Sequence, residues 1–121
     1  MKAITWVLLL SIAVLSGCAA FQTGSEVLHG RQAFLIGKNE EALAYFQSAV
    51  QRDPNYIYGT ALRQSIWSYV GRAEYAAGRY PQARQTLERA VAANRDEDIA
   101  RLYLGMTLAR ADERPQALKE I

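Results

Sequence analysis

Little of the side-chain chemistry on which catalysis and metal binding depend is present in this sequence. The 121 residues include one cysteine, Cys18, and one histidine, His29. No second thiol is available for a disulfide, and no second histidine or cysteine completes a metal site or a Cys-His pair. A glycine-rich phosphate loop and a G-x-S-x-G serine elbow are also absent. We therefore expect a protein that is not an enzyme and that uses no metal or other cofactor.

The sequence also lacks a large excess of either positive or negative charge. The chain has 14 basic and 12 acidic side chains and a net charge of +2, and its longest run of like charge is the triplet at residues 96–98. A nucleic-acid-binding domain would carry a basic patch or stripe, so nucleic acid is excluded as a partner. Glu40 and Glu41 are adjacent acids, but neighbours on a helix point in different directions. We expect them to stabilise a helix N-terminus rather than to form a catalytic pair.

The longest apolar run lies at the N-terminus. Lys2 follows the first methionine, and residues 3–15 are apolar apart from Thr5 and Ser11. Two small residues then lead into Cys18. This arrangement is typical of a secretory signal and is too short for a transmembrane helix. The sequence therefore predicts a signal peptide over residues 1–17.

The segment Leu15-Ser16-Gly17-Cys18 resembles the lipobox of bacterial lipoproteins. The resemblance implies that the Cys18 thiol receives a diacylglycerol and that its amine, exposed by cleavage, is usually acylated as well. Ala19 stands where retention in the inner membrane usually shows aspartate, which implies a lipid anchor in the outer membrane of the cell envelope, facing the periplasm. Residues 18–25 are then a lipidated N-terminus and a short mobile tether to a domain at residues 26–121. The alternative is a buried or unmodified thiol.

Three segments of the remaining chain align with one another, beginning at Gly37, Gly78 and Asp112. Each has an alanine five residues after its first residue, and the alanines of the second and third segments are 34 residues apart. Apolar residues near these alanines recur at the i, i+3, i+4, i+7 spacing of an amphipathic helix. The aligned small residues are Ala42, Ala83 and Ala117, preceded by Gly30, Gly71 and Gly105.

A 34-residue period of paired helices with small residues at the crossings is similar to the tetratricopeptide-repeat family. The resemblance covers nearly all of the chain after the signal, with repeats at about residues 23–56, 64–97 and 98–121. It implies an all-α fold, a right-handed α-solenoid of about three helix-turn-helix repeats with the last incomplete. With the lipobox, the sequence is identified as a bacterial tetratricopeptide-repeat lipoprotein. The expected helices are 25–36, 39–52, 57–77, 80–93, 97–111 and 114–121.

The sequence departs from the family pattern at two places. The first two repeats are 41 residues apart, and the seven extra residues lie near residues 57–63. Two added helical turns would rotate an apolar face by only ~20°, so we expect the helix at residues 57–77 to protrude beyond its neighbours. The chain also stops inside the last expected helix without a polar capping helix. It is therefore expected to be a fragment, or to have its last apolar face covered by something else.

In the tetratricopeptide-repeat family, the first helices of successive repeats line a concave groove that holds peptides. Arg72 is expected to lie exposed in the middle of this groove. His29 is expected to lie outside the groove, in the core or between two packed helices. Aromatic rings beside guanidinium groups suit a peptide with apolar side chains and carboxylates. The alternative is that the aromatic residues are partly core and the arginines merely solvated. By resemblance the groove residues are Arg31, Phe34, Arg72, Tyr75, Met106 and Arg110, with Val27, Leu35, Ser68 and Leu102 at further groove positions.

The resemblance implies a non-catalytic, lipid-anchored adaptor that binds protein or peptide partners during envelope or pilus assembly. The family's clamp of Lys and Asn residues for carboxylates is not reproduced, which argues against binding of chaperone tails. Two alternatives stay open. The chain could be a structural subunit that self-associates as a homo-oligomer through its uncapped last helix, or the N-terminal fragment of a longer protein, an enzyme included.

Overall fold

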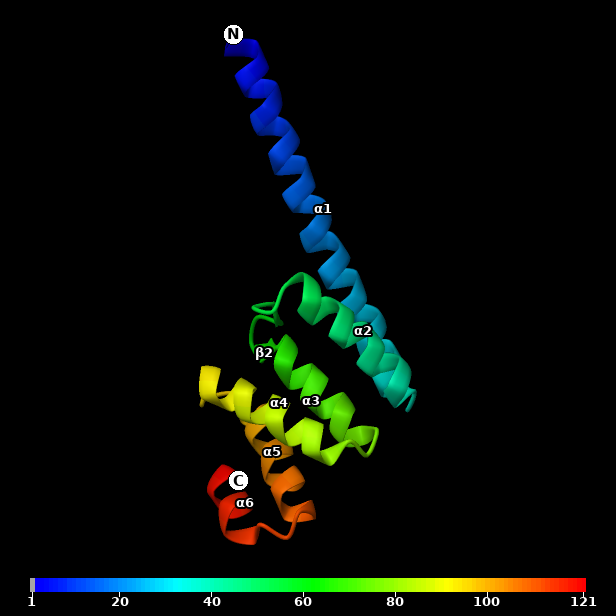
Figure 1. Ribbon diagram of the computed structural model, residues 1–121, viewed down its shortest axis with the longest axis vertical. Helices are drawn as coiled ribbons and strands as arrows, with labels where there is room; N and C mark the ends of the chain where they lie inside the picture. The colour runs from blue at the N-terminus through cyan, green and yellow to red at the C-terminus, as the bar shows by residue number, and fades with distance from the viewer. Residues whose placement is uncertain (1) are drawn as a thin grey trace.

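The computed structural model describes the backbone of residues 2–121 and the side chains of residues 2–7 and 18–121. Over residues 2–121, six helices carry the fold, and a two-stranded antiparallel hairpin separates the second helix from the third (Figure 1). The predicted all-α helical repeat fold is thereby confirmed. The elements are α1 (Lys2–Leu35), α2 (Asn39–Arg52), β1 (Ile57–Tyr58), β2 (Gln64–Ser65), α3 (Ile66–Ala76), α4 (Tyr80–Ala93), α5 (Asp98–Arg110) and α6 (Arg114–Glu120).

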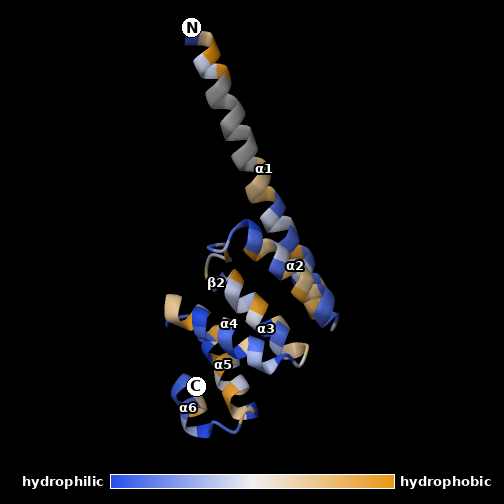
Figure 2. Ribbon diagram, viewed as in Figure 1, coloured by the Kyte–Doolittle hydropathy of each residue, from blue (hydrophilic) through white to orange (hydrophobic). Residues whose placement is uncertain are grey.

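Each helix packs against the next helix in sequence, and α3 also contacts α5. This is the contact order of a solenoid, in which a repeat touches only its neighbours. The N-terminal part of α1 projects beyond the other helices, whereas its C-terminal part packs on α2 (Figure 1). Figure 2 shows hydrophobic and hydrophilic residues interleaved along α2, α3 and α4, as amphipathic packing requires.

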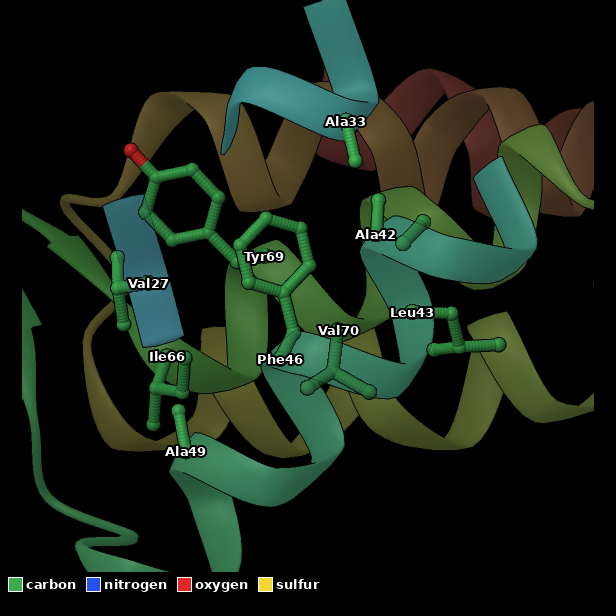
Figure 3. Close-up of a cluster of buried hydrophobic side chains, with 10 residues drawn as sticks. Val27, Ala33, Ala42, Leu43, Phe46, Ala49, Ile66, Tyr69 and Val70 are labelled. Atoms are coloured by element: carbon green, nitrogen blue, oxygen red, sulfur yellow. The ribbon is translucent and has the colours of Figure 1, made fainter. Parts of the chain in front are cut away.

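Small residues allow the helices to cross closely. Ala42 and Ala83 are fully buried, as the aligned repeats predict (Figure 3 for Ala42). A Cβ placed at Gly30 would lie 2.5 Å from the Phe46 ring, and one at Gly71 would lie 2.5 Å from Leu87 Cγ. Both distances are shorter than real Cβ contacts. The glycines are therefore required by the packing of the helices on each other.

The chain reverses between paired helices at two predicted glycines. Gly37 ends α1 with φ 78° and Gly78 ends α3 with φ 77°. This left-handed conformation is available to glycine at little cost and is the common way for a helix to stop. Pro81 and Pro115 then stand in the first turns of α4 and α6, where a missing N–H costs nothing.

The predicted long helix over residues 57–77 is wrong. Residues 57–58 and 64–65 form the hairpin instead, with Ile57 opposite Ser65 and Tyr58 opposite Gln64. Gly59 has φ 89°, a left-handed conformation that a right-handed helix does not contain. The two residues before it, Ile57 and Tyr58, are β-branched and aromatic, and such side chains favour strands. The helix begins only after Ser65, whose side chain caps it by accepting a hydrogen bond from the Ser68 N–H at 3.2 Å.

Two further expectations need correction. The mobile tether predicted at residues 18–25 is helical, because α1 runs through it and buries Thr23 against the domain. Gln22 is also tied to α2, since Arg52 Nη1 donates to its Oε1 at 2.8 Å. His29 is exposed rather than core, and it does lie between helices, with its ring 5.5 Å from that of Tyr45 on α2. The division of the chain at residue 17 stays a prediction.

Candidate functional site

The predicted groove residues lie on the first helix of each pair. Arg31 and Phe34 come from α1, Arg72 and Tyr75 from α3, and Met106 and Arg110 from α5. Arg110 is exposed and the other five are half-buried. Two of the further groove positions are wrong, since Val27 and Ser68 are fully buried in the core, whereas Leu35 and Leu102 are exposed.

Arg72 occupies the centre of this surface and is half-buried rather than exposed. Its guanidinium carbon lies 5.3 Å from the ring centroid of Phe34, 5.2 Å from that of Tyr69 and 5.3 Å from that of Tyr103. One Nη donates to Gln64 Oε1 at 2.5 Å, and the buried Nε has no hydrogen-bond partner among the residues that the structure describes. Three rings from three helices therefore hold one guanidinium whose hydrogen-bonding capacity is incompletely used.

Arg31 lies beside the hairpin at the α1 side of the surface. Its guanidinium carbon is 4.1 Å from the ring centroid of Tyr58, and Nη1 donates to the Tyr58 hydroxyl. The Tyr58 ring in turn meets Tyr69 edge-on at 6.1 Å. Burial raises the pKa of Tyr69, and the positive charges of Arg31 and Arg72 partly oppose that rise. Tyr69 is thus a neutral aromatic wall shared by two guanidinium groups.

Arg110 closes the opposite end of the surface. Its Nε donates to the Tyr75 hydroxyl at 3.3 Å, and its guanidinium carbon lies 5.1 Å from the Tyr80 ring centroid. Tyr75 packs edge-on against Tyr103 at 5.6 Å. A cavity of about 450 Å³ between α4 and α5 begins beside Arg110 and is lined in part by Tyr80 and Thr107. The aromatic surface therefore continues into a recess at this end.

We call these residues the arginine–tyrosine surface. Among the described residues, no ion pair includes any of its three arginines, whereas Arg52, Arg79, Arg84, Arg95, Arg101 and Arg114 all pair with carboxylates. The hydrogen bonds that these three arginines donate to described residues go to neutral oxygens, on tyrosine or glutamine. Such a surface can accept carboxylates between aromatic rings. Its members are Arg31, Phe34, Tyr58, Gln64, Tyr69, Arg72, Tyr75, Tyr80, Tyr103 and Arg110.

Five residues of this surface are not among the predicted groove residues, namely Tyr58, Gln64, Tyr69, Tyr80 and Tyr103. Tyr69 and Tyr103 are 34 residues apart, and each lies two residues before an aligned glycine, Gly71 or Gly105. The repeat alignment could therefore have identified both tyrosines. Tyr58 and Gln64 belong to the hairpin, at a place where the sequence predicts a helix, so their hydrogen bonds with the arginines do not follow from the sequence pattern. Only the pairing of the strands shows their role.

The predicted lipidation site lies on α1. Cys18 is exposed, and the side chains of the residues 15–17 that precede it lie outside the described part of the structure. Within that part, no helix has the length and hydropathy of a membrane span. The described side chains also contain no group of three His, Cys, Asp or Glu residues placed to hold a metal ion.

Solved structures share this arrangement of helices at low sequence identity. The TPR domain of OM64 from Arabidopsis superposes with a TM-score of 0.73 at 14% identity, covering 84% of this chain and 78% of that chain. The translocator chaperone SycD of Yersinia enterocolitica type III secretion gives 0.72 at 17% identity, covering 90% and 76%. The second TPR of Spaghetti (RPAP3), solved with the HSP90 peptide SRMEEVD, gives 0.70 at 19% identity, covering 82% and 85%.

No curated protein sequence matches the chain. Residues 34–104, however, match the Tetratricopeptide repeat family. This match extends over more than half of the chain and includes α2, the hairpin, α3 and α4. The paired helices, the close crossings at small residues and the solved structures of the same fold agree with it. This chain belongs to the tetratricopeptide-repeat family.

Proposed function

We propose that this chain is a non-catalytic adaptor that binds acidic segments of partner proteins on its arginine–tyrosine surface. The observation that carries the proposal is the set of three guanidinium groups, on three helices, whose hydrogen-bond partners within the described part of the chain are all neutral oxygens. Pairs of guanidinium and carboxylate groups are among the strong, charge-assisted hydrogen bonds of proteins, and the carboxylate brings a charge opposite to that of the arginine, which a neutral acceptor does not. Carboxylates of a partner can therefore replace Tyr58, Gln64 and Tyr75 as acceptors with a gain in binding energy.

The aromatic rings supply the second part of the recognition. Arg72 lies among Phe34, Tyr69 and Tyr103, so a partner whose carboxylate reaches it also brings its neighbouring apolar side chains close to these rings. Aromatic and arginine side chains are the residues that dominate binding energy in protein interfaces. Two structures of the same fold hold peptide segments, namely RPAP3 with the acidic peptide SRMEEVD and PcrH with the chaperone binding region of PopB. They support a similar use of the fold here.

The adaptor is proposed to act at a membrane, held by lipid on Cys18 in the outer membrane of a bacterial envelope, with partners that belong to envelope or pilus assembly. The lipobox-like residues carry this part. The helical course of α1 supports it, since Cys18 and Arg31 lie on one continuous helix, about 20 Å apart along its axis at 1.5 Å per residue. A partner bound to the surface would then sit at a fixed, short distance from the lipid.

The proposal is tested by selecting ligands from a random peptide library displayed on phage. The bait is the wild-type chain, and the comparison is the triple variant Arg31→Gln, Arg72→Gln, Arg110→Gln. We expect wild type to enrich peptides with Asp or Glu beside an aromatic residue, and the triple variant to lose them while its circular dichroism stays helical. Arg114→Gln, on α6, is the matched control and should select as wild type does.

An enriched peptide then gives a quantitative test by titration calorimetry. Loss of one charge-assisted hydrogen bond costs about 1.5–3 kcal/mol, so Arg72→Gln should weaken the peptide by roughly 10- to 100-fold. Selected peptides that are no more acidic than the library, or that bind the triple variant equally well, would show that this surface is not the ligand site.

A second candidate function is self-association as a structural subunit, favoured by the exposed Leu118 and Ile121 at α6. Sedimentation velocity of the chain and of Leu118→Glu distinguishes it from the first. A dimer that Leu118→Glu dissociates would support self-association, and a wild-type monomer at high concentration would contradict it.

A further inference from the structure

The hairpin has two faces with different surroundings. Successive residues of a strand point to opposite sides, so Tyr58 and Gln64 face the same way and Ile57 and Ser65 face the other. The first pair contacts Arg31 and Arg72 on the arginine–tyrosine surface. The second pair lines a separate pocket of about 380 Å³. No residue lines both sites, so the inserted segment builds one wall of each.

The opposite walls of this pocket come from α3 and α4. Trp67, in the first turn of α3, supplies a large aromatic surface, and Ala90 and Ala93 near the end of α4 leave space beside it. Arg89 lies over the indole, with its guanidinium carbon 4.4 Å from the ring centroid. The volume falls in the range of pockets that hold small ligands, roughly 300–1,000 Å³. A single aromatic side chain fits such a space.

The pocket is held in shape by a buried carboxylate. Glu97, just before α5, is only 4% exposed, and its Oε1 accepts a hydrogen bond from the Ser65 N–H at 2.9 Å. The adjacent Ile66 N–H donates to the Tyr56 carbonyl at 2.9 Å, which fixes the base of the hairpin. These bonds join the hairpin to the start of α5, so the pocket is a built feature of the fold.

The charges at the pocket are unequal. Arg63 and Arg89 both line it, and among the described residues neither takes part in an ion pair. Glu97 supplies the one carboxylate in the lining, and this carboxylate already accepts a hydrogen bond from the Ser65 backbone N–H. An occupant with an apolar body and a negative charge therefore matches the pocket, whereas a cationic one would meet two guanidinium groups.

We propose that this pocket is a second binding site, which takes an aromatic side chain of a partner protein with an adjacent carboxylate on Arg63 and Arg89. It is independent of the function proposed for the arginine–tyrosine surface, because none of the residues that line the pocket belongs to that surface. The seven inserted residues thus give this chain a site that a regular 34-residue repeat has no segment to form.

The experiment follows the indole N–H of Trp67 by NMR in the detergent-solubilised full chain. The chain has two tryptophans, so Trp6→Phe in every sample leaves Trp67 as the only reporter. The probe is N-acetylphenylalanine, which is a carboxylate at neutral pH, and its matched control is N-acetylphenylalaninamide. A ligand of about 15 non-hydrogen atoms should bind with a Kd on the order of 1 mM, and loss of the charge-assisted bonds should weaken the amide about 10-fold or more.

Variants assign the binding to this pocket. Arg63→Gln with Arg89→Gln should weaken N-acetylphenylalanine about 10-fold or more, whereas Arg110→Gln, on the arginine–tyrosine surface, should leave its Kd unchanged. Circular dichroism checks that each variant is folded. Equal binding of acid and amide, no saturable shift of the Trp67 signal up to about 20 mM probe, or an equal loss in Arg110→Gln would each overturn the proposal. Its failure would leave the phage selection on the other surface unaffected.

Discussion

Replacement of Gly71 by alanine is expected to destabilise the protein, although the same change stabilises most helices. Gly71 lies in the interior of α3, where alanine is favoured over glycine by about 1 kcal/mol. The added Cβ, however, would lie 2.5 Å from Leu87 Cγ and 2.6 Å from Cδ2. Leu87 is fully buried, and overpacking of this kind costs about 1–3 kcal/mol. The overlap should outweigh the propensity, with a net loss of about 1 kcal/mol and a melting temperature about 4–8 °C lower.

The same argument predicts that the sign reverses when Leu87 is shortened. Leu87→Ala alone should cost about 2–5 kcal/mol, because it leaves a cavity beside Gly71. In that background the three atoms nearest to the new Cβ, all from the Leu87 side chain, are gone, and the helix propensity remains. Gly71→Ala should then stabilise by about 1 kcal/mol, which gives a coupling of about 2 kcal/mol between the two positions.

Urea unfolding followed by circular dichroism measures all four corners of this cycle. Gly24→Ala is the matched control, since it lies in α1 and its Cβ would have only the Tyr56 hydroxyl nearby, at 3.6 Å. The control should gain stability while Gly71→Ala loses it. A Gly71→Ala variant that is stabilised in both backgrounds would refute the close crossing of α3 and α4.

Three other substitutions test the helix packing at Ala83, the pKa of Glu74 and the lipidation of Cys18. Ala83 is fully buried at a helix crossing, so Ala83→Leu should cost ~1–3 kcal/mol and lower the melting temperature by several degrees, and an unchanged melt would mean that the crossing has room. Burial raises the pKa of the Glu74 carboxyl, and the hydrogen bond that this carboxyl accepts from Thr86 partly opposes the rise. The folded state therefore favours the protonated acid, and the stability this contributes is complete below the ordinary glutamate pKa and lost as pH rises through the raised one. Glu74→Gln should then gain on wild type in urea unfolding as pH increases across that window, and a pH-independent difference would contradict the cause. Cys18→Ala should incorporate no labelled fatty acid and accumulate as uncleaved precursor, whereas label retained in the variant would rule out Cys18 as the acceptor.

Residues whose role depends on short-range sequence pattern could be predicted well. The glycines that end α1 and α3, the prolines that begin α4 and α6, and the alanines buried at the crossings all follow from spacing and backbone preference. A helix can be recognised from its own residues because its hydrogen bonds are local. The 34-residue period then fixes which helices pair, since neighbouring repeats must bury the same faces.

The candidate site could be predicted only in part. Arg31, Phe34, Arg72 and Tyr75 follow from the repeat alignment, and the structure brings Arg72 onto the Phe34 ring. The alignment could not show that Arg72 is half-buried among rings from three helices, because that depends on how the helices cross. It also placed Val27 in the groove, whereas close packing of α1 on α2 buries that side chain completely.

The sequence by itself determined the repeat, the positions of most helix ends and the small residues at the crossings, because each of these depends on residues close together in the chain. Tertiary structure decided the conformation of the seven inserted residues. These residues could continue a helix or form a hairpin, and the hairpin is distinguished by the pairing of Ile57 with Ser65. This pairing requires the chain to reverse direction between the two strands, after Gly59 takes a positive φ. That pairing directs Tyr58 and Gln64 to one surface and Ile57 and Ser65 to another, since a strand sends alternate side chains to opposite faces.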